Sequence, residues 1–188
     1  VAHAPAPLAQ EPDPQGVPDW VREIRIGGLF YLSYQDGETN GESYSKSVLK
    51  RGHVDVMGDP LPHLFVRMTT DAKHDAEDDF GVRIKYAFGR LHTDRWGPIT
   101  QPFLEFGQVR LPWIYFEESI YRYRMQDGTF MDRLGLTASA DRGFTVGGLL
   151  GGTMPAAYCE RVNPRIPGRR GSFAFGLYNG GGFTRSEK

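Results

Sequence analysis

Charged side chains that recur inside apolar segments are the residues of this sequence with the clearest chemical use. In FGVRIKYAFG (80–89), Arg83 and Lys85 alternate with apolar side chains, which is the period of a β-strand and places both cations on one face. Such charges can line a water-filled passage and set its ion selectivity, or they can pair with opposite charges on neighbouring strands and leave the selectivity unchanged. Both roles stay open for the residues that we predict to line a pore: Arg25, Arg51, His53, Arg67, Arg83, Lys85 and Glu105.

The side of FGVRIKYAFG that faces water decides between two classes of protein. In a soluble protein the apolar face packs into a core, whereas in a membrane barrel it meets lipid and the charges line a pore. In the barrel, Val82, Ile84 and Tyr86 would contact lipid. The inward acids besides Glu105 would be Glu23, Asp55 and Asp71. Basic groups would then be in slight excess, which predicts a mild preference for anions.

A second group of charges lies in residues 112–141, a segment without strand alternation in which FEESIYRYRM predicts a short helix. We interpret this segment as a constriction loop, with Glu117, Glu118, Arg122, Arg124, Asp132 and Arg133 as its functional residues. Opposed acids and bases would order dipolar solutes by a transverse field. Alternatively, they latch the loop to the wall by salt bridges. Both interpretations stay open.

Enzymatic and metal chemistry find no support in the residue spacing. Glu117 and Glu118 are adjacent and point in different directions, whereas glycosidases need facing carboxyl groups about 5–9.5 Å apart. The five histidines lack metal-ligand spacing, and the segment DGETNG (36–41) has Ser47 where a calcium loop needs glutamate. Motifs for phosphate-binding loops and nucleophiles are also missing. We therefore predict a protein that is not an enzyme and holds neither a metal nor a cofactor.

Seven strands are predicted to position these charges. They are 23–35, 47–58, 63–71, 80–89, 103–112, 142–151 and 171–180, with DGETNGESYS as a polar loop and a bulge near Gly107. Residues 1–20, with five prolines, are predicted to be an extended leader before a single domain over 21–188. The chain has 188 residues, one cysteine and a net charge of −1, so a nucleic-acid partner is not expected.

The length and chemistry of the strands predict an all-β, antiparallel transmembrane β-barrel. Most are longer than the usual strand of about 5–6 residues, and long connections alternate with short ones, as expected of an outer-membrane barrel. A closed bacterial barrel needs an even number of strands, at least about 8. Seven strands therefore predict part of a larger barrel that a longer chain or another chain completes.

Several ordered motifs resemble the porin family that includes the phosphate- and polyphosphate-selective outer-membrane porins. They are Gly107, Gln108, Arg110, Pro112 and Trp113, then Glu117 and Glu118, Asp132 and Arg133, Asp141 to Gly143, and Tyr178 to Gly180. The resemblance covers roughly residues 22–188 and corresponds to the N-terminal half of such a porin. It implies a barrel, usually of about 16 strands and often trimeric, that passes small hydrophilic solutes through the outer membrane of Gram-negative bacteria.

The resemblance also implies outer-membrane lipid and lipopolysaccharide as surroundings, with a homotrimer or a membrane assembly as partner. A dense ladder of Lys and Arg is missing, so phosphate selectivity is not carried over. Two other functions stay open. A soluble β-sandwich could bind carbohydrate on Tyr31, Tyr34 and Trp113, if the even-numbered strand residues packed into one core. A partial porin could also be a non-conducting structural subunit of an outer-membrane assembly.

Overall fold

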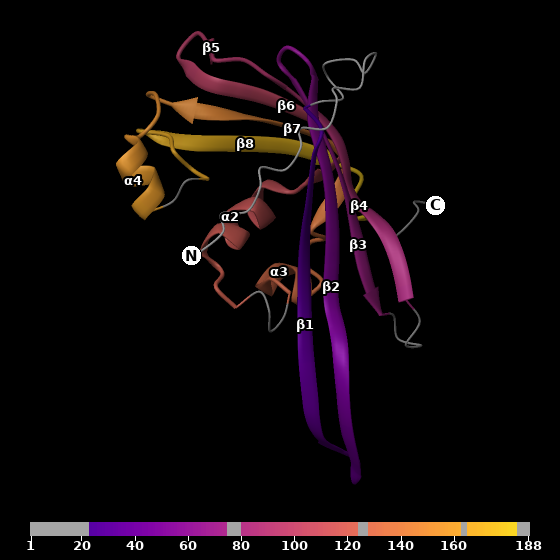
Figure 1. Ribbon diagram of the computed structural model, residues 1–188. Helices are drawn as coiled ribbons and strands as arrows, with labels where there is room; N and C mark the ends of the chain where they lie inside the picture. Colours follow the sequence, from indigo (N-terminus) through magenta and orange to yellow (C-terminus); the bar gives the residue numbers. More distant parts are fainter. Residues whose placement is uncertain (1–22, 75–79, 124–127, 163–164, 184–188) are drawn as a thin grey trace, which may run out of the picture.

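Antiparallel β-sheet makes up most of the protein, as the alternating sequence predicts (Figure 1). The computed structural model describes residues 23–74, 80–123, 128–162 and 165–183. The predicted Pro-rich leader, residues 1–20, lies outside the described residues. The all-β prediction is therefore confirmed for the part of the chain that is described.

Within the described ranges, eight strands and three short helices follow one another along the chain. The strands are β1 (Arg25–Thr39), β2 (Glu42–Leu61), β3 (Leu64–His74), β4 (Phe80–His92), β5 (Arg95–Trp96), β6 (Ile99–Arg110), β7 (Ala140–Leu150) and β8 (Gly171–Tyr178). The helices are α2 (Pro112–Ile120), α3 (Phe130–Arg133) and α4 (Ala156–Arg161). The predicted helix within 112–141 exists, but it begins at Pro112, whose fixed φ suits the first helical turn.

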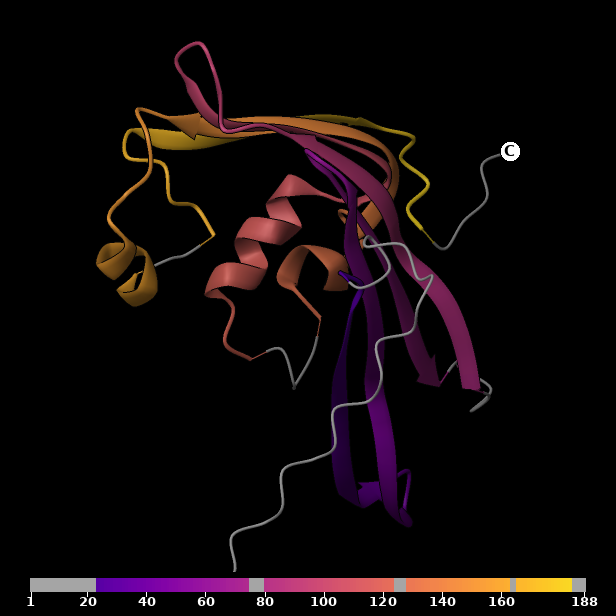
Figure 2. The same cartoon turned by 45° about the horizontal axis from the view of Figure 1, so that its top comes forward.

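Each long strand pairs with the next one along the chain, in the order β1-β2-β3-β4-β6-β7-β8, and the short β5 pairs with β6. Within the described residues, β1 and β8 therefore pair on one side only. The sheet curves so that β1 to β3 run at a steep angle to β6 to β8, with α2 and α3 lying on the concave side (Figures 1 and 2).

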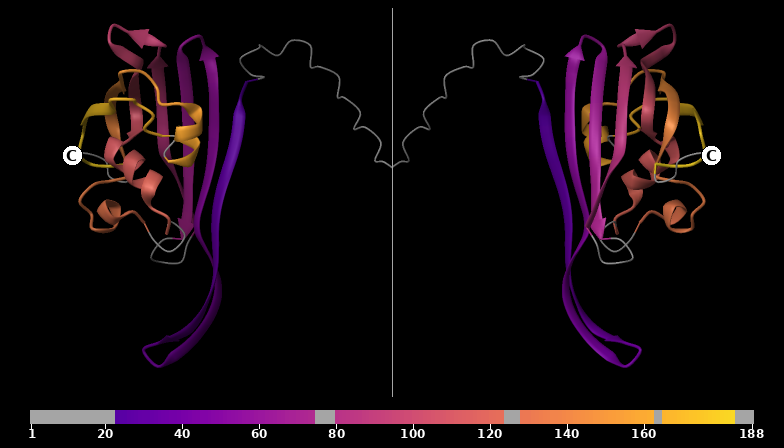
Figure 3. Two further views of the ribbon diagram at one scale, coloured as in Figure 1. Left: turned by 90° about the vertical axis from the view of Figure 1, so that its left-hand side faces the viewer. Right: turned by 90° about the vertical axis from the view of Figure 1, so that its right-hand side faces the viewer.

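The predicted polar loop DGETNGESYS is not a loop in the structure. Its residues continue β1 and β2 as a paired hairpin, and the turn itself is only Asn40 and Gly41. Both turn residues have positive φ, 55° and 83°, as an Asn-Gly hairpin turn requires. The hairpin projects well beyond the rest of the sheet (Figure 3). The connection between β7 and β8, at the opposite end from this turn, spans residues 151–170, so connection lengths do not alternate as simply as predicted.

The two faces of the sheet have unlike chemistry. We call the face covered by α2 the inner face and the opposite one the outer face. Cross-strand pairing aligns Val66, Gly89, Phe106, Phe144 and Leu177 in one row across the outer face from β3 to β8. Most of the large apolar side chains in this row are exposed. The inner face instead buries polar residues together with a small apolar core.

That core lies between the sheet and the helices. Tyr86, Phe88 and Val109 of β4 and β6 form its centre, with Ala140 beside them. Ile114 of α2 is fully buried as well. Because so few apolar residues are enclosed, the sheet is held chiefly by its hydrogen-bonded ladders and by polar contacts on the inner face.

A bulge in β4 corrects the predicted orientation of Tyr86. Thr69 pairs with Tyr86 but Thr70 pairs with Ile84, so Lys85 is the extra residue. The side chains of Lys85 and Tyr86 are both buried, at 2% and 4% exposure, and Tyr86 belongs to the inner-face core. Val82 and Ile84 are exposed on the outer face, as predicted. Tyr86 is therefore not an outward residue, because the bulge reverses the alternation after Ile84.

The bulge predicted near Gly107 lies elsewhere, between Thr100 and Phe103, where Gln101 has a φ of 49°. Gly107 has a different constraint. Its φ is +118°, and an added Cβ would lie 2.5 Å from the carbonyl oxygen of Ala87 on β4. Only glycine fits this close approach of two backbones.

We expect Gly107→Ala to lower the free energy of unfolding by more than about 1 kcal/mol. Backbone strain alone costs about 1–3 kcal/mol, and the clash against the neighbouring strand adds to it. A urea titration of the folded chain would measure this loss. Gly27→Ala is the matched control, since nothing lies within 4 Å of its added Cβ, and it should change stability by less than about 0.5 kcal/mol. Equal losses in the two variants would contradict this account.

Candidate functional site on the inner face

Ion pairs join neighbouring strands over the first part of the inner face. Arg67 of β3 donates to the Asp55 carboxylate of β2 from two nitrogens, at 3.0 and 2.8 Å, and Thr69 donates to the same oxygen. Next to them, His53 Nε2 lies 2.9 Å and Arg51 Nε 3.8 Å from Asp71 of β3. These residues face one another because the antiparallel register places them on the same side of adjacent strands.

Three cationic side chains surround the ring of Tyr86. The charged groups of Arg67, Lys85 and Arg110 lie 5.3, 5.3 and 5.5 Å from the ring centroid. They come from β3, β4 and the end of β6, and each distance is within the range of cation–π attraction. The bulge at Lys85 reverses the alternation of side chains, and it also brings a buried ammonium and an aromatic ring to the same face.

On the second half of the inner face, an ion pair joins β4 to β6. Arg90 of β4 donates to Glu105 of β6 from Nε at 2.8 Å, and its Nη2 also bonds that carboxylate. The Arg90 guanidinium stacks on Phe103 at 4.9 Å. Beside this pair, the hydroxyl groups of Thr145 and Tyr178 are 2.7 Å apart. The predicted pore residue Glu105 is thus buried and paired with a cation that our prediction did not include.

The two remaining predicted pore residues, Arg25 and Arg83, lie on the same face but, unlike the residues above, are exposed. Arg25 is exposed and pairs with Asp59 at 2.9 Å. Arg83 is exposed and stands opposite Asp71 in the strand register. Across the predicted set, most charges are therefore partnered between strands, in agreement with the interpretation in which pairing cancels much of their bias.

The segment between β6 and β7 folds into the concavity of the sheet through α2 and α3 (Figure 2). Glu117 is buried and accepts a hydrogen bond from the backbone N–H of Phe130 at 2.7 Å, so it joins the two helices. Glu118 lies 3.3 Å from Arg110 at the end of β6. These two acids therefore hold the segment in place, which is the latching role left open by the sequence.

The other residues predicted for this segment lie in α3 or beyond the end of α2. Asp132 and Arg133 belong to α3, and Arg122 is exposed after α2. Arg124 lies outside the described residues. Of the residues predicted for this segment, Glu117 and Glu118 have contacts that tie the segment together and to the end of β6.

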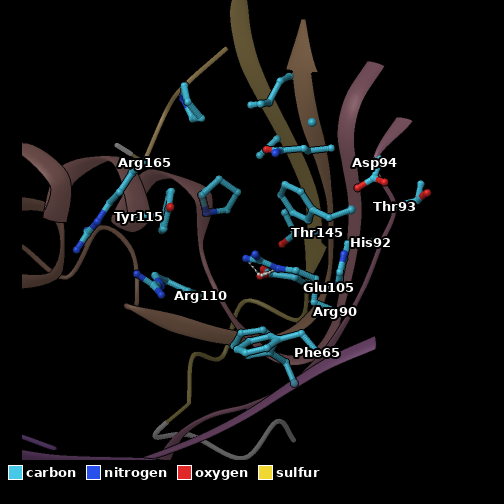
Figure 4. A pocket seen from close by; sticks show the side chains of 18 of the residues that line it. Phe65, Arg90, His92, Thr93, Asp94, Glu105, Arg110, Tyr115, Thr145 and Arg165 are labelled. Atoms are coloured by element: carbon cyan, nitrogen blue, oxygen red, sulfur yellow. Dashed lines mark hydrogen bonds and ion pairs between the residues drawn. The ribbon is translucent and has the colours of Figure 1, made fainter. Parts of the chain in front are cut away.

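A cavity of about 550 Å³ lies between the inner face and α2 (Figure 4). Residues of β2, β3, β4, β6, β7 and β8 line it, together with α2, the segment after β4 and the connection between β7 and β8. The charged residues that line it are Asp59, Arg90, Asp94, Glu105, Arg110 and Arg165. Phe65, Phe88, Phe103 and Leu149 supply apolar surface. Among the described residues, this cavity combines charged and apolar lining in a volume that could hold a small solute.

Sequence reasoning missed Arg90, Arg165 and Tyr115 in this cavity. Arg90 was missed because the alternation was followed only to Gly89, and the bulge had already shifted the face of the residues beyond Ile84. Tyr115 and Arg165 come from non-strand segments, where periodicity gives no orientation. Arg110 was noted only as part of a motif, although its position at the end of β6 places it between Tyr86 and Tyr115.

Comparison with family models, with curated proteins and with solved structures found no match for this chain. Among the described residues, none of the helices has the length and apolar character needed to cross a membrane. Function must therefore be argued from the geometry and chemistry of the sheet itself.

The ion pairs of the inner face can be ranked by double-mutant cycles. Asp55 and Arg67 each keep only 19% of their side-chain surface exposed, whereas Arg25 and Asp59 keep 56% and 38%. We expect alanine cycles to give a coupling of about 1–3 kcal/mol for the Arg67–Asp55 pair, measured by chemical unfolding. The Arg25–Asp59 cycle is the matched control and should give less than about 1 kcal/mol, because solvent screens exposed pairs. A stronger coupling in the exposed pair would contradict this ranking.

Proposed function

We propose that this chain forms part of the wall of an outer-membrane β-barrel channel, through which small hydrophilic solutes diffuse passively. In this proposal the inner face borders the aqueous passage and the outer face meets lipid. The porin-like motifs of the sequence, from Gly107 to Gly180, favour the same function. The protein would act without chemical catalysis, and its selectivity would come from the charges and the cavity on the inner face.

The observation that carries the proposal is the inverted distribution of polarity between the two faces. Ile26, Val82 and Phe175 on the outer face are 75%, 60% and 69% exposed. On the inner face, by contrast, Lys85 and Glu105 are buried. A water-soluble sheet normally hides its apolar face and exposes its charges. An apolar outer face with a polar interior is what a transmembrane barrel requires.

The height of the apolar band supports lipid as its partner. On β1 the exposed apolar side chains of the outer face run from Ile24 to Tyr34. Ten residue steps of about 3.3 Å span roughly 33 Å along the strand. A tilt of about 35–45° reduces this to roughly 25 Å, which is the height of the apolar band in such barrels. Beyond Tyr34 the outer face carries Asp36 and Glu38, so the projecting hairpin would stand in water.

The proposal requires further strands at both edges of the sheet. β1 and β8 pair on one side only among the described residues, and unpaired backbone groups in lipid cost several kcal/mol each. Strands supplied by another part of a longer protein, or by a second chain, would satisfy these groups. A homotrimer or another outer-membrane assembly then follows as the expected setting, with lipid and lipopolysaccharide around it.

The soluble β-sandwich alternative is weaker on this geometry. It needs the even-numbered side chains of the strands to pack into one core, yet Ile26, Leu32 and Tyr34 are exposed. The described strands also form one sheet, so no second sheet covers these residues. A non-conducting structural role keeps the same membrane placement, and conductance separates it from a channel.

Arginine substitutions at matched positions on the two faces test the membrane placement. Val54 on the outer face and Leu29 on the inner face are 41% and 44% exposed and lie on adjacent strands. We expect Val54→Arg to weaken folding into lipid vesicles by about 2–4 kcal/mol, because the charge would lie near the middle of the bilayer. Leu29→Arg should have little effect. Folding is measured as the fraction with heat-dependent mobility on a denaturing gel, and equal effects of the two variants would contradict the proposal.

Conductance tests the channel itself. The protein, extracted from membranes in its native assembly, should produce stepwise current increases in a planar lipid bilayer. A mild anion preference is expected in the zero-current potential under a salt gradient, because basic groups are in slight excess on the inner face. Stable insertion without current would favour the structural subunit, and failure to enter any bilayer would overturn the proposal.

A further inference from the structure

We propose that His63 and His92 together bind one divalent transition-metal ion, such as Zn²⁺, at the end of the β3–β4 ladder, with water in its remaining coordination positions. The inference goes beyond the proposed function and does not rest on it. It is carried by the cross-strand placement of the two imidazoles, by the backbone conformation of His63 and by the acidic cavity that both side chains line.

Strand pairing brings the two histidines together, although they are far apart in the sequence. Leu64 of β3 pairs with Leu91 of β4, and His63 and His92 are the next residues outward from this pair. The His92 N–H donates to the His63 carbonyl oxygen at 2.9 Å, which fixes the two backbones relative to each other. The spacing of histidines along the chain gave no sign of a metal site, because these two become neighbours only across the ladder.

The distance between the two imidazole rings suits one shared ion. Their centroids are 6.1 Å apart and their planes differ by 73°. A metal–nitrogen bond of about 2.0–2.1 Å places the ion roughly 3.2 Å from a ring centre, so two rings that share an ion lie at most about 6.4 Å apart. Both side chains are exposed, and among the described residues no hydrogen bond or ion pair engages either imidazole. Both rings are therefore accessible to a metal.

The backbone of His63 indicates a use for its side chain. Pro62 and His63 form the two-residue turn between Leu61 and Leu64, which pair with each other. His63 has a φ of 64°, in the left-handed region that glycine or asparagine usually occupies at this position of a turn. Other residues in such conformations cost free energy and concentrate at functional sites. The ring of Pro62 fixes its own φ, so the imidazole that follows is carried on a preorganised turn.

Acidic side chains surround the histidine pair with a field that favours cations. A cavity of about 400 Å³ is lined by both histidines together with Glu23 and Asp59. Asp59 pairs with Arg25 at 2.9 Å, so Glu23 contributes most of the negative charge. Among the described residues, no group of three or more His, Cys, Asp or Glu side chains is placed to hold a metal. The histidines are therefore the two protein ligands, and water fills the open positions of the ion.

The ligand atoms select the class of ion. Imidazole nitrogen suits Zn²⁺, Ni²⁺ and Cu²⁺, whereas Mg²⁺ and Ca²⁺ prefer shells of oxygen ligands. Two imidazoles with a single unpaired acid nearby therefore favour a transition metal over a hard cation. Zn²⁺ is the probe of choice because it has no redox chemistry that could modify the protein. Mg²⁺ carries the same charge and is the matched control ion.

Zinc binding to single variants tests the inference. Equilibrium dialysis of the full chain in its native assembly, in detergent and at neutral pH, measures the affinity for each ion. We expect Zn²⁺ to bind at least about tenfold more tightly than Mg²⁺. His63→Asn and His92→Gln should each weaken Zn²⁺ binding at least about tenfold, because the remaining imidazole loses its chelating partner. Asparagine tolerates positive φ, so the first variant keeps the turn.

The matched control variant is His3→Gln, which removes a histidine from the N-terminal segment and should leave the affinity for Zn²⁺ unchanged. Equal Zn²⁺ binding by the wild-type chain and both site variants would overturn the inference. A loss in only one of the two variants would also overturn it, because the ion would then be held by a single histidine.

Chemical modification of the unaltered chain gives a second test that needs no variant to fold. Diethyl pyrocarbonate acylates accessible imidazole nitrogen, and mass spectrometry of the peptides measures the labelling of each histidine. We expect His63 and His92 to be labelled without metal and both to be protected by Zn²⁺, but not by Mg²⁺. Protection of neither histidine, or of only one, would overturn the shared site.

The metal site and the channel proposal can fail separately. If the bilayer current is present but Zn²⁺ binds equally to the wild-type chain and both site variants, the metal site fails and the channel stands. If both histidines are required for Zn²⁺ binding but the protein carries no current, the channel proposal fails and the metal site stands.

Discussion

The β4 bulge at Lys85 is the constraint on which the inner face depends. An extra residue would leave backbone carbonyls in this strand without a regular partner. The side-chain amide of Gln108 on β6 donates to the carbonyl oxygens of Ile84 and Lys85, at 2.7 and 3.0 Å, and so satisfies them. The bulge turns Tyr86 and Phe88 inward. If the strict alternation of Val82 and Ile84 continued, these rings would face outward, and both the apolar core and the three-cation cluster around Tyr86 would be lost.

Pairing across strands gives the inner face its character. A sheet with one polar face can keep that face buried only if each charge finds a partner, because an unpaired buried charge costs several kcal/mol. The antiparallel register supplies partners directly, as for Arg67 with Asp55 and Arg90 with Glu105. The consequence is a face that is strongly polar yet nearly neutral. Selectivity on such a face depends more on where the charges are placed than on their small net sum.

The sequence predicted the part of the fold that depends on local periodicity. Seven strands and the outward position of Val82 and Ile84 follow from alternation alone, because a pleated strand sends successive side chains to opposite faces. The reversal at Tyr86 could not be predicted in this way, since it depends on Gln108 from another strand. The hairpin turn was also missed, although Asn40-Gly41 is a strong turn signal, because the polar residues around it were taken for loop instead of water-exposed strand.

The same reasoning could predict only some of the residues of the candidate site. Residues such as His53 and Glu105 were found because they lie inside alternating segments. Tyr115 and Arg165 come from a helix and a connection, and only the folding of both onto the inner face brings them to Arg110. The latching role of Glu117 likewise depends on Phe130, which lies 13 residues further along the chain. Sites built between a strand face and a returning segment are tertiary features, and no local pattern encodes them.

Additional strands would cover the exposed side of α2 and would also pair with the two edges of the sheet. One side of α2 is packed on the sheet through Ile114, but its other side carries Trp113 and Phe116, whose rings lie 5.6 Å apart and are 49% and 36% exposed. In the proposed barrel, strands that pair with β1 and β8 would continue the curvature of the sheet around this second side. Closure would then cover the aromatic surface of α2 and satisfy the edge hydrogen bonds together. A flat assembly would satisfy the edges but leave these rings exposed, so the placement of α2 favours a curved wall.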